Sequence, residues 1–142
     1  YKRSTDNGIT WSADTCLIED TGMGAFPSAA ASGSNVHIVW VDERDGNLEI
    51  YYKRSTDNGV NWEPDTRLTN DSAESGYSSV AVSGPCVHVV WTDGRDGLYE
   101  IYYKRNPTGN SGIAEKEKSL INQTATLENP YPNPFFKRTS LL

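Results

Sequence analysis

The chain has 142 residues, of which 36% are hydrophobic, and it carries a net charge of -6 with a pI near 4.8. This length suits one domain with a modest core. An acidic chain lacks the basic surface that phosphate contacts require, so we do not expect binding to nucleic acid. No apolar run approaches the roughly 20 residues of a membrane-spanning helix, so we do not expect membrane insertion.

An internal repeat organises most of the chain. Residues 1–8, Tyr-Lys-Arg-Ser-Thr-Asp-Asn-Gly, recur unchanged at 52–59, which sets a period of 51 residues. The Val-His-x-Val-Trp segment at 36–40 recurs at 87–91 with the same offset. A third copy begins at Tyr103 and loses the pattern after Arg105. A period of about 50 residues indicates propeller blades or a solenoid.

Alternating apolar residues and turn sequences place the strands within each repeat. In chain order, we predict strands at 48–54, 66–69, 79–83, 87–92 and 99–105. Turns are predicted at Asp57-Asn58-Gly59 and at Arg95-Asp96-Gly97. The strand at 87–92 is apolar at nearly every residue, so both of its faces should be buried, as they are when blades stack.

The predicted fold is all-β, with four-stranded antiparallel blades and about two blades in this chain. By repetition, the chain contains strands three and four of one blade, a whole blade, and strands one to three of another. Closed propellers have about four to eight blades. We therefore expect further blades, from a longer protein or from other copies, to complete the ring.

The composition changes after the repeats. Residues 1–106 hold the blades, 107–126 resemble a linker, and 127–142 carry three prolines at alternating positions, which favours an extended tail. Cys16 and Cys86 occupy different positions in the repeat, so neither indicates a disulfide framework.

Two segments carry a family resemblance. Residues 4–11 and 55–62 both fit Ser-x-Asp-x-Gly-x-x-Trp, which resembles the Asp box, or bacterial neuraminidase repeat, of sialidases and related propellers. Here Gly supplies the positive φ of the turn, and the Asp carboxylate can accept backbone N–H groups. We therefore expect a structural role for these residues: Ser4, Asp6, Gly8, Trp11, Ser55, Asp57, Gly59 and Trp62.

The tail carries a second resemblance. Asn-Pro-Tyr-Pro-Asn-Pro-Phe at 129–135 resembles the opening of a C-terminal sorting domain used in type IX secretion, with Pro130 as a departure from the usual pattern. The resemblance covers only a truncated start of that domain, at 127–142. It implies a secreted or cell-surface bacterial protein.

The candidate ligand face lies at the end of the sheets opposite the Asp boxes. In a four-stranded meander, the turns between strands one and two and between strands three and four share one end. The remaining turns share the other end, where the resemblance places the sialidase active site. That end should carry Asp42, Arg44, Asp45, Asp93, Arg95 and Asp96. The arginines could clamp a carboxylate, or each could pair with neighbouring aspartates and brace the blades.

No catalytic set is recognised. The resemblance implies three arginines, a Tyr nucleophile paired with Glu, and an acid/base Asp drawn from several blades. No arginine here lies in the Arg-Ile-Pro motif of that family, and the tyrosines at 51, 52, 102 and 103 are predicted to be packing residues.

No metal or cofactor is expected. Calcium bound by Asp42 and Asp45 is the alternative, although these residues lack the Asp-x-Asx-x-Asx-Gly spacing. His37 and His88 recur mid-strand, which favours packing over metal binding.

Three functions follow from these features. The first is an extracellular, non-catalytic module for glycan binding, adhesion or surface assembly. The second is a fragment of a sialidase-like glycoside hydrolase. The third is a structural subunit whose copies join through unpaired strand edges into a ring or a filament. Expected partners are a glycan or cell-surface ligand, together with other copies or the remainder of a longer propeller.

Overall fold

The computed structural model describes residues 1–19 and 22–106. Within this part the all-β prediction is confirmed, because its regular elements are strands in two antiparallel sheets. The described residues also contain no apolar helix of membrane-spanning length. The predicted linker at 107–126 and the predicted sorting-domain start at 127–142 lie outside the described residues.

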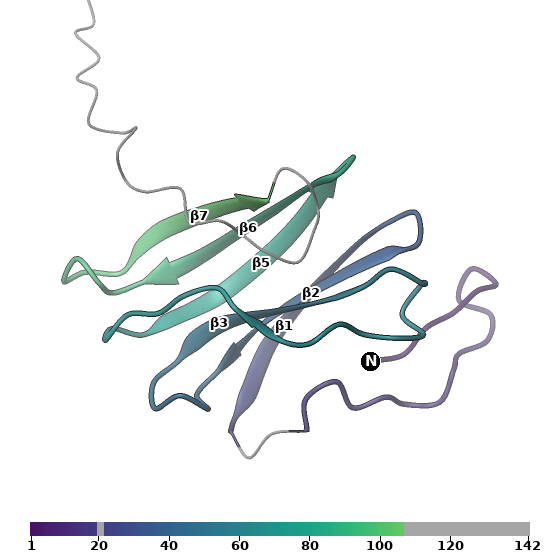
Figure 1. Ribbon diagram of the computed structural model, residues 1–142, viewed down its shortest axis with the longest axis horizontal. Helices are drawn as coiled ribbons and strands as arrows, with labels where there is room; N and C mark the ends of the chain where they lie inside the picture. Colours follow the sequence, from purple (N-terminus) through teal and green to yellow (C-terminus); the bar gives the residue numbers. More distant parts are fainter. Residues whose placement is uncertain (20–21, 107–142) are drawn as a thin grey trace, which may run out of the picture.

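The two sheets repeat the same meander (Figure 1). The first contains β1 (Gly24–Ser32), β2 (Asn35–Asp42), β3 (Glu49–Ser55) and β4 (Thr66–Arg67) in that order. The second contains β5 (Ser75–Ser83), β6 (Cys86–Asp93) and β7 (Glu100–Asn106). The strands predicted at 48–54, 87–92 and 99–105 differ from these by one residue at each end at most.

Two predicted boundaries were wrong. The strand predicted at 79–83 begins at Ser75, because a β-bulge between Gly76 and Ser79 lets pairing with β6 continue. The strand predicted at 66–69 ends at Arg67. The backbone N–H of Leu68 still donates to Ile50 O, and the Thr69 hydroxyl accepts from Ile50 N, so a side chain replaces part of the ladder.

The N-terminal segment, residues 1–19, forms a hairpin but contains no assigned strand, unlike the expected strands three and four. Three backbone hydrogen bonds join its two arms. Ser12 N donates to Arg3 O, and Tyr1 and Thr15 exchange N–H···O bonds of 2.8 and 2.9 Å. No described strand extends this pairing on either side, which limits it to isolated bonds.

The core lies between the two sheets. On one face of the first sheet, Val39, Val41, Ile50 and Tyr52 are buried against side chains of the second sheet. Those side chains include Val80, Val89 and Trp91. Because alternate residues of a strand point to opposite faces, Ile38, Trp40 and Tyr51 face the other way. There they pack against Leu17 and Ile18 of the N-terminal segment, among others.

The N-terminal segment packs against the first sheet in the same way that residues 52–69 pack against the second sheet. Lys53 Nζ donates to Leu17 O at 2.6 Å, and Lys104 Nζ donates to Leu68 O. Both the donors and the acceptors are 51 residues apart, so one packing relation occurs twice in the molecule.

The burial predicted for strand two is confirmed for β2 and wrong for β6. In β2 both faces are covered, whereas Val90 of β6 is exposed. Within the described residues no third sheet covers that face. The sheets do not close into a ring, so the propeller remains a prediction.

The packing predicts different roles for the two equivalent Asp-box tryptophans. Trp62 packs on the cluster of Ile38, Trp40 and Tyr51 and meets the Tyr1 ring edge-on at 5.0 Å, whereas Trp11 is exposed. We expect Trp62→Ala to lower the free energy of unfolding by about 2 kcal/mol, because it leaves a partly filled cavity. Trp11→Ala should change it by less than about 1 kcal/mol. Urea unfolding of both variants measures the difference, and equal losses would contradict this packing.

Candidate functional site

The two kinds of motif lie at opposite ends of the sheets, as expected. At one end, Asn58 N in the second Asp box donates to Ser34 O in the β1–β2 turn at 2.8 Å. At the other end, the β2–β3 turn meets the loop that enters the second sheet, where Ser75 N donates to Leu48 O at 2.8 Å. The motifs that contain Arg44 and Arg95 belong to this second end.

In the first Asp box, hydrogen bonds close the turn from within. Ser4 Oγ donates to Asp6 Oδ1 at 2.7 Å and accepts from Gly8 N at 2.8 Å. Thr10 donates its backbone N–H and its hydroxyl to the two oxygens of Asp6. Asn7 and Gly8 both have positive φ, at 57° and 85°, so Asn shares the left-handed conformation expected only of Gly.

The second Asp box repeats this network. Ser55 Oγ donates to Asp57 Oδ1 at 2.8 Å, and Asn61 donates through both its backbone and its side-chain amide to Asp57. These bonds favour the ionised carboxylate. The side-chain and backbone bonds from Thr10 lower the pKa of Asp6 from its ordinary 3.8 to about 2. The backbone and side-chain bonds from Asn61 lower that of Asp57 to about 2 as well.

At the opposite end, each Arg pairs with the Asp two residues before it. Arg44 Nη2 lies 2.6 Å from Asp42 Oδ2, and Arg95 Nη2 lies 2.5 Å from Asp93 Oδ2. Trp40 and Trp91 donate their indole N–H to the same two aspartates at 2.8 and 2.9 Å. Both carboxylates are therefore buried with their charge compensated.

Electrostatics reinforce these two clusters. Burial raises the pKa of Asp42 and of Asp93, but the hydrogen bonds from the paired Arg and Trp outweigh it and bring each pKa below its usual value. Each guanidinium also stacks 4.5 Å above a tyrosine ring, Arg44 over Tyr51 and Arg95 over Tyr102. The two arginines thus have structural contacts in their own sheets.

Asp45 and Asp96 accept from the hydroxyls of those same tyrosines, Tyr51 and Tyr102 respectively. The first cluster also extends further: Asp45 pairs with Arg67 at 2.8 Å, and Arg44 pairs with Asp65 at 2.9 Å. Among the described residues, no group of three or more His, Cys, Asp or Glu side chains is arranged to hold a metal ion.

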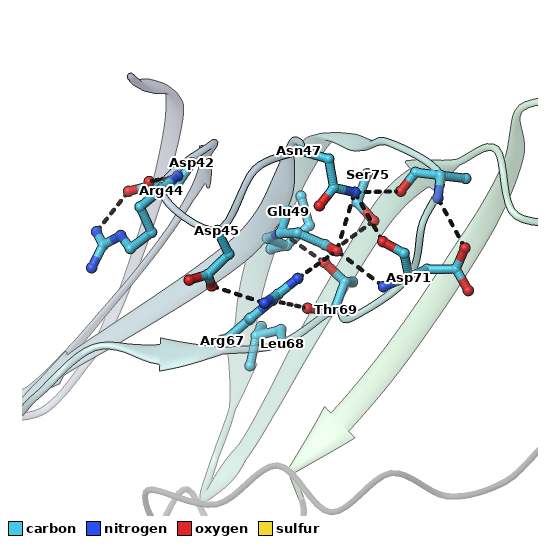
Figure 2. A network of polar contacts seen from close by, with 12 residues as sticks. Asp42, Arg44, Asp45, Asn47, Glu49, Arg67, Leu68, Thr69, Asp71 and Ser75 are labelled. Carbon is cyan, nitrogen blue, oxygen red and sulfur yellow. Dashed lines mark hydrogen bonds and ion pairs between the residues drawn. The ribbon is translucent and has the colours of Figure 1, made fainter. Parts of the chain in front are cut away.

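Figure 2 shows a network that sequence reasoning missed. Glu49 is fully buried, and its Oε1 accepts from Arg67 Nη2 at 2.8 Å and from Asp71 N at 3.0 Å. Asn47 Nδ2 donates to Asp71 O and Ala73 O, which holds the loop between the sheets. Glu100 has the same place in the repeat but is exposed. The only sequence signal for this position is that Glu-Ile occurs at both 49–50 and 100–101.

A groove of about 560 Å³ opens beside the N-terminal segment, lined by Arg44, Lys53, Trp62 and Asp65 among others. Its charged groups neutralise one another, because Asp65 pairs with both Lys53 and Arg44 at 2.8 and 2.9 Å. The two histidines make cross-strand contacts instead of sharing a site. His37 Nδ1 lies 2.7 Å from the Tyr52 hydroxyl, and His88 Nδ1 lies 2.8 Å from that of Tyr103.

Sequence reasoning also missed an aromatic pair, Phe26 and Tyr77, at the bulges of β1 and β5. Their ring centroids are 5.4 Å apart with an interplanar angle of 36°. The rings are 59% and 72% exposed, and both residues have positive φ, at 52° and 50°. Register places them close to Val41 and Thr92, at the end opposite the Asp boxes. The sequence signal that could have identified this pair is an aromatic residue at equivalent positions of both repeats.

The buried network predicts unequal effects of one substitution at two equivalent positions. Glu49→Gln removes a buried charge that compensates Arg67, so we expect the free energy of unfolding to fall by about 3 kcal/mol. Glu100→Gln, at the exposed counterpart, should change it by less than about 0.5 kcal/mol. Denaturant unfolding at neutral pH measures both, and a small loss for Glu49→Gln would contradict the assigned network.

The lowered pKa of Asp57 predicts a pH dependence. A carboxyl whose pKa falls on folding stabilises the fold above its unfolded pKa, and this stabilisation is lost as pH falls from about 4 through about 2. Asp57→Asn should therefore lower the thermal midpoint at pH 7, and the difference from wild type should shrink at pH 2.5. Asp14→Asn, which removes an exposed ion pair with Lys2, is the control and should have little effect at pH 7. A constant difference for Asp57→Asn would contradict this assignment.

Comparison with known proteins agrees with the first of the two Asp boxes. No curated protein and no solved structure shows significant similarity to this chain. Residues 2–13 match the family model of the BNR/Asp-box repeat.

Proposed function

We propose that this chain is an extracellular, non-catalytic Asp-box repeat module that binds glycans through Phe26 and Tyr77. The observation that carries the proposal is the exposure of both rings on strained backbone. An aromatic residue in the left-handed region costs of the order of 1–3 kcal/mol and is characteristic of functional positions. Here it occurs twice at the same register.

Packing within the described residues does not compensate this strain. The rings contact each other, yet more than half of each remains accessible. A ligand that covered both rings would supply the missing burial, at about 25 cal/mol per Å² of apolar surface. Sugar rings present C–H faces that suit such aromatic surfaces. The resemblance of the repeats to those of sialidases supports the same class of ligand.

Polar groups for orienting a sugar lie at the same end of the second sheet. Glu74 and Tyr99 are exposed there, and the Tyr99 hydroxyl donates to Glu74 Oε2 at 3.3 Å. Glu74 precedes Tyr77 by three residues, and its carbonyl accepts from Gly94 N. Carboxylate and hydroxyl groups beside aromatic rings match the alternation of polar and apolar surface on a sugar.

Binding is favoured over hydrolysis because Arg44 and Arg95 pair with buried aspartates of their own sheets. A guanidinium that already compensates a buried carboxylate would leave that charge unpaired if it turned to a substrate. The sialidase-like hydrolase would need arginines that do not already compensate buried carboxylates in their own sheets.

The test combines glycan binding with stability. The double variant Phe26→Gly/Tyr77→Gly removes both rings and relieves the positive φ, so we expect binding on an array of neutral and sialylated oligosaccharides to fall at least tenfold. The thermal midpoint should stay the same or rise. Trp11→Ala, which removes an exposed ring at the other end, is the matched control and should retain binding.

Two results would contradict the proposal. One is unchanged glycan binding by the double glycine variant. The other is release of free sugar from the oligosaccharides by the wild-type chain, which would restore the hydrolase hypothesis.

A further inference from the structure

One face of the second sheet is apolar and uncovered within the described residues. Val90, Ile101 and Tyr103 are 40%, 74% and 55% exposed there, and Thr92 completes this open face. Register confirms that the four share a face, since Val90 pairs with Tyr103 and Thr92 pairs with Ile101.

The first sheet shows what such a face packs against. The counterparts of Val90, Ile101 and Tyr103 are Val39, Ile50 and Tyr52, which are all buried. They are covered by the second sheet, through Val80, Val89 and Trp91. The residues of the first sheet equivalent to Val89 and Trp91 are Ile38 and Trp40. The chain therefore contains, in its own first sheet, side chains of the type that covers this face.

The edge of β7 also indicates that a segment equivalent to part of the first repeat belongs beside the second sheet. In the first sheet, β3 pairs with β4 through Tyr51 with Arg67 and Tyr52 with Thr66. The second sheet ends at β7, and no described strand pairs with its far edge. Thr15 and Cys16 in the N-terminal segment lie 51 residues before Thr66 and Arg67, so they are the counterparts of these two residues. The bond from Lys53 to Leu17 O shows that this segment already has the position of a fourth strand against the sheet that follows it.

We propose that a second copy of this chain docks head-to-tail on the open face. Its first sheet covers Val90, Ile101 and Tyr103, and its Thr15 and Cys16 pair with Tyr103 and Tyr102 as the missing fourth strand. The composite sheet then has four strands, three from one copy and one from the next.

Docking requires one exchange within the N-terminal segment. Before docking, Tyr1 and Arg3 of the incoming copy bond to its own Thr15 and Ser12. In the composite sheet, the triplet at 103–105 of the other copy takes that place. The two triplets are identical in sequence, so the backbone bonds that Tyr1 and Arg3 make to Thr15 and Ser12 can be replaced by bonds of the same kind from β7. The apolar contact is gained while the number of these backbone hydrogen bonds is largely conserved.

The interface joins two different surfaces, so it is heterologous and each copy exposes a further open face. Such an interface closes into a ring when the rotation allows it. The two described sheets of each copy would then be blades of a propeller, and closed propellers have about four to eight blades. By the same relation, docking brings Phe26 of the incoming copy beside Tyr77, as Phe26 and Tyr77 meet within one chain. Glycan binding is therefore measured separately on a monomeric variant.

The first test is sedimentation velocity of the full chain over a range of concentrations. We expect a mass above the 15.7 kDa of one chain. Ile101→Lys places a charge on the open face at an exposed position and should give monomers that keep their β-sheet circular dichroism. Val60→Lys, at an exposed apolar residue in the second Asp box, is the matched control and should still assemble.

The second test maps the edge. Residues opposite each other on antiparallel strands have Cβ atoms about 4.5–5.5 Å apart, near the range that a disulfide can bridge. Tyr102→Cys should therefore form disulfide-linked dimers and larger species with the native Cys16 of the next copy. Cys16→Ser in the same variant should abolish them, and Val60→Cys should not form them.

Two outcomes overturn the proposal. A monomer at all concentrations would show that no second copy covers the face, whether or not Ile101→Lys lowers the thermal midpoint. Assembly that survives Ile101→Lys and gives no link to Cys16 would show that copies join elsewhere. Glycan binding measured on the Ile101→Lys monomer separates either outcome from failure of the proposed function.

Discussion

The structure depends on one constraint: each sheet is apolar on both faces and must be covered on both. The first sheet meets this requirement with the second sheet on one side and the N-terminal segment on the other. Among the residues that the structure describes, the second sheet is covered on one side only. Because the strands of both sheets come from nearly the same sequence, burial depends on the neighbours of a strand and not on its own residues. Val39 and Val90 are the clearest pair.

Polar residues at the sheet ends determine how the sheets are held in register. The Asp boxes tie each hairpin within itself, since Asp6 and Asp57 accept from residues three or four positions on. At the opposite end, Glu49 joins β3 to the loop that leads into the second sheet. Its burial is tolerated because Arg67 compensates its charge. One end is therefore locally closed, and the other connects neighbouring sheets.

The bulges of β1 and β5 place Phe26 and Tyr77 on strained backbone. A β-bulge turns one residue out of the ladder, and here the residue turned out is aromatic in both sheets. Glycine would adopt the same φ without steric cost. A structural role would be met by a smaller residue, so two exposed rings on this backbone favour a role in recognition.

The sequence by itself determined the repeat, the all-β class, the approximate strands and the opposite placement of the two motifs, because these follow from local patterns of apolar residues and turns. Tertiary structure alone decided three things. Ser75 became the start of β5 through a bulge that alternation does not reveal. Glu49 was buried and Glu100 exposed, because Arg67 and the loop to the next sheet surround only the first. Phe26 and Tyr77 came together because stacking places the bulges of successive sheets side by side, a contact across 51 residues that no local pattern encodes.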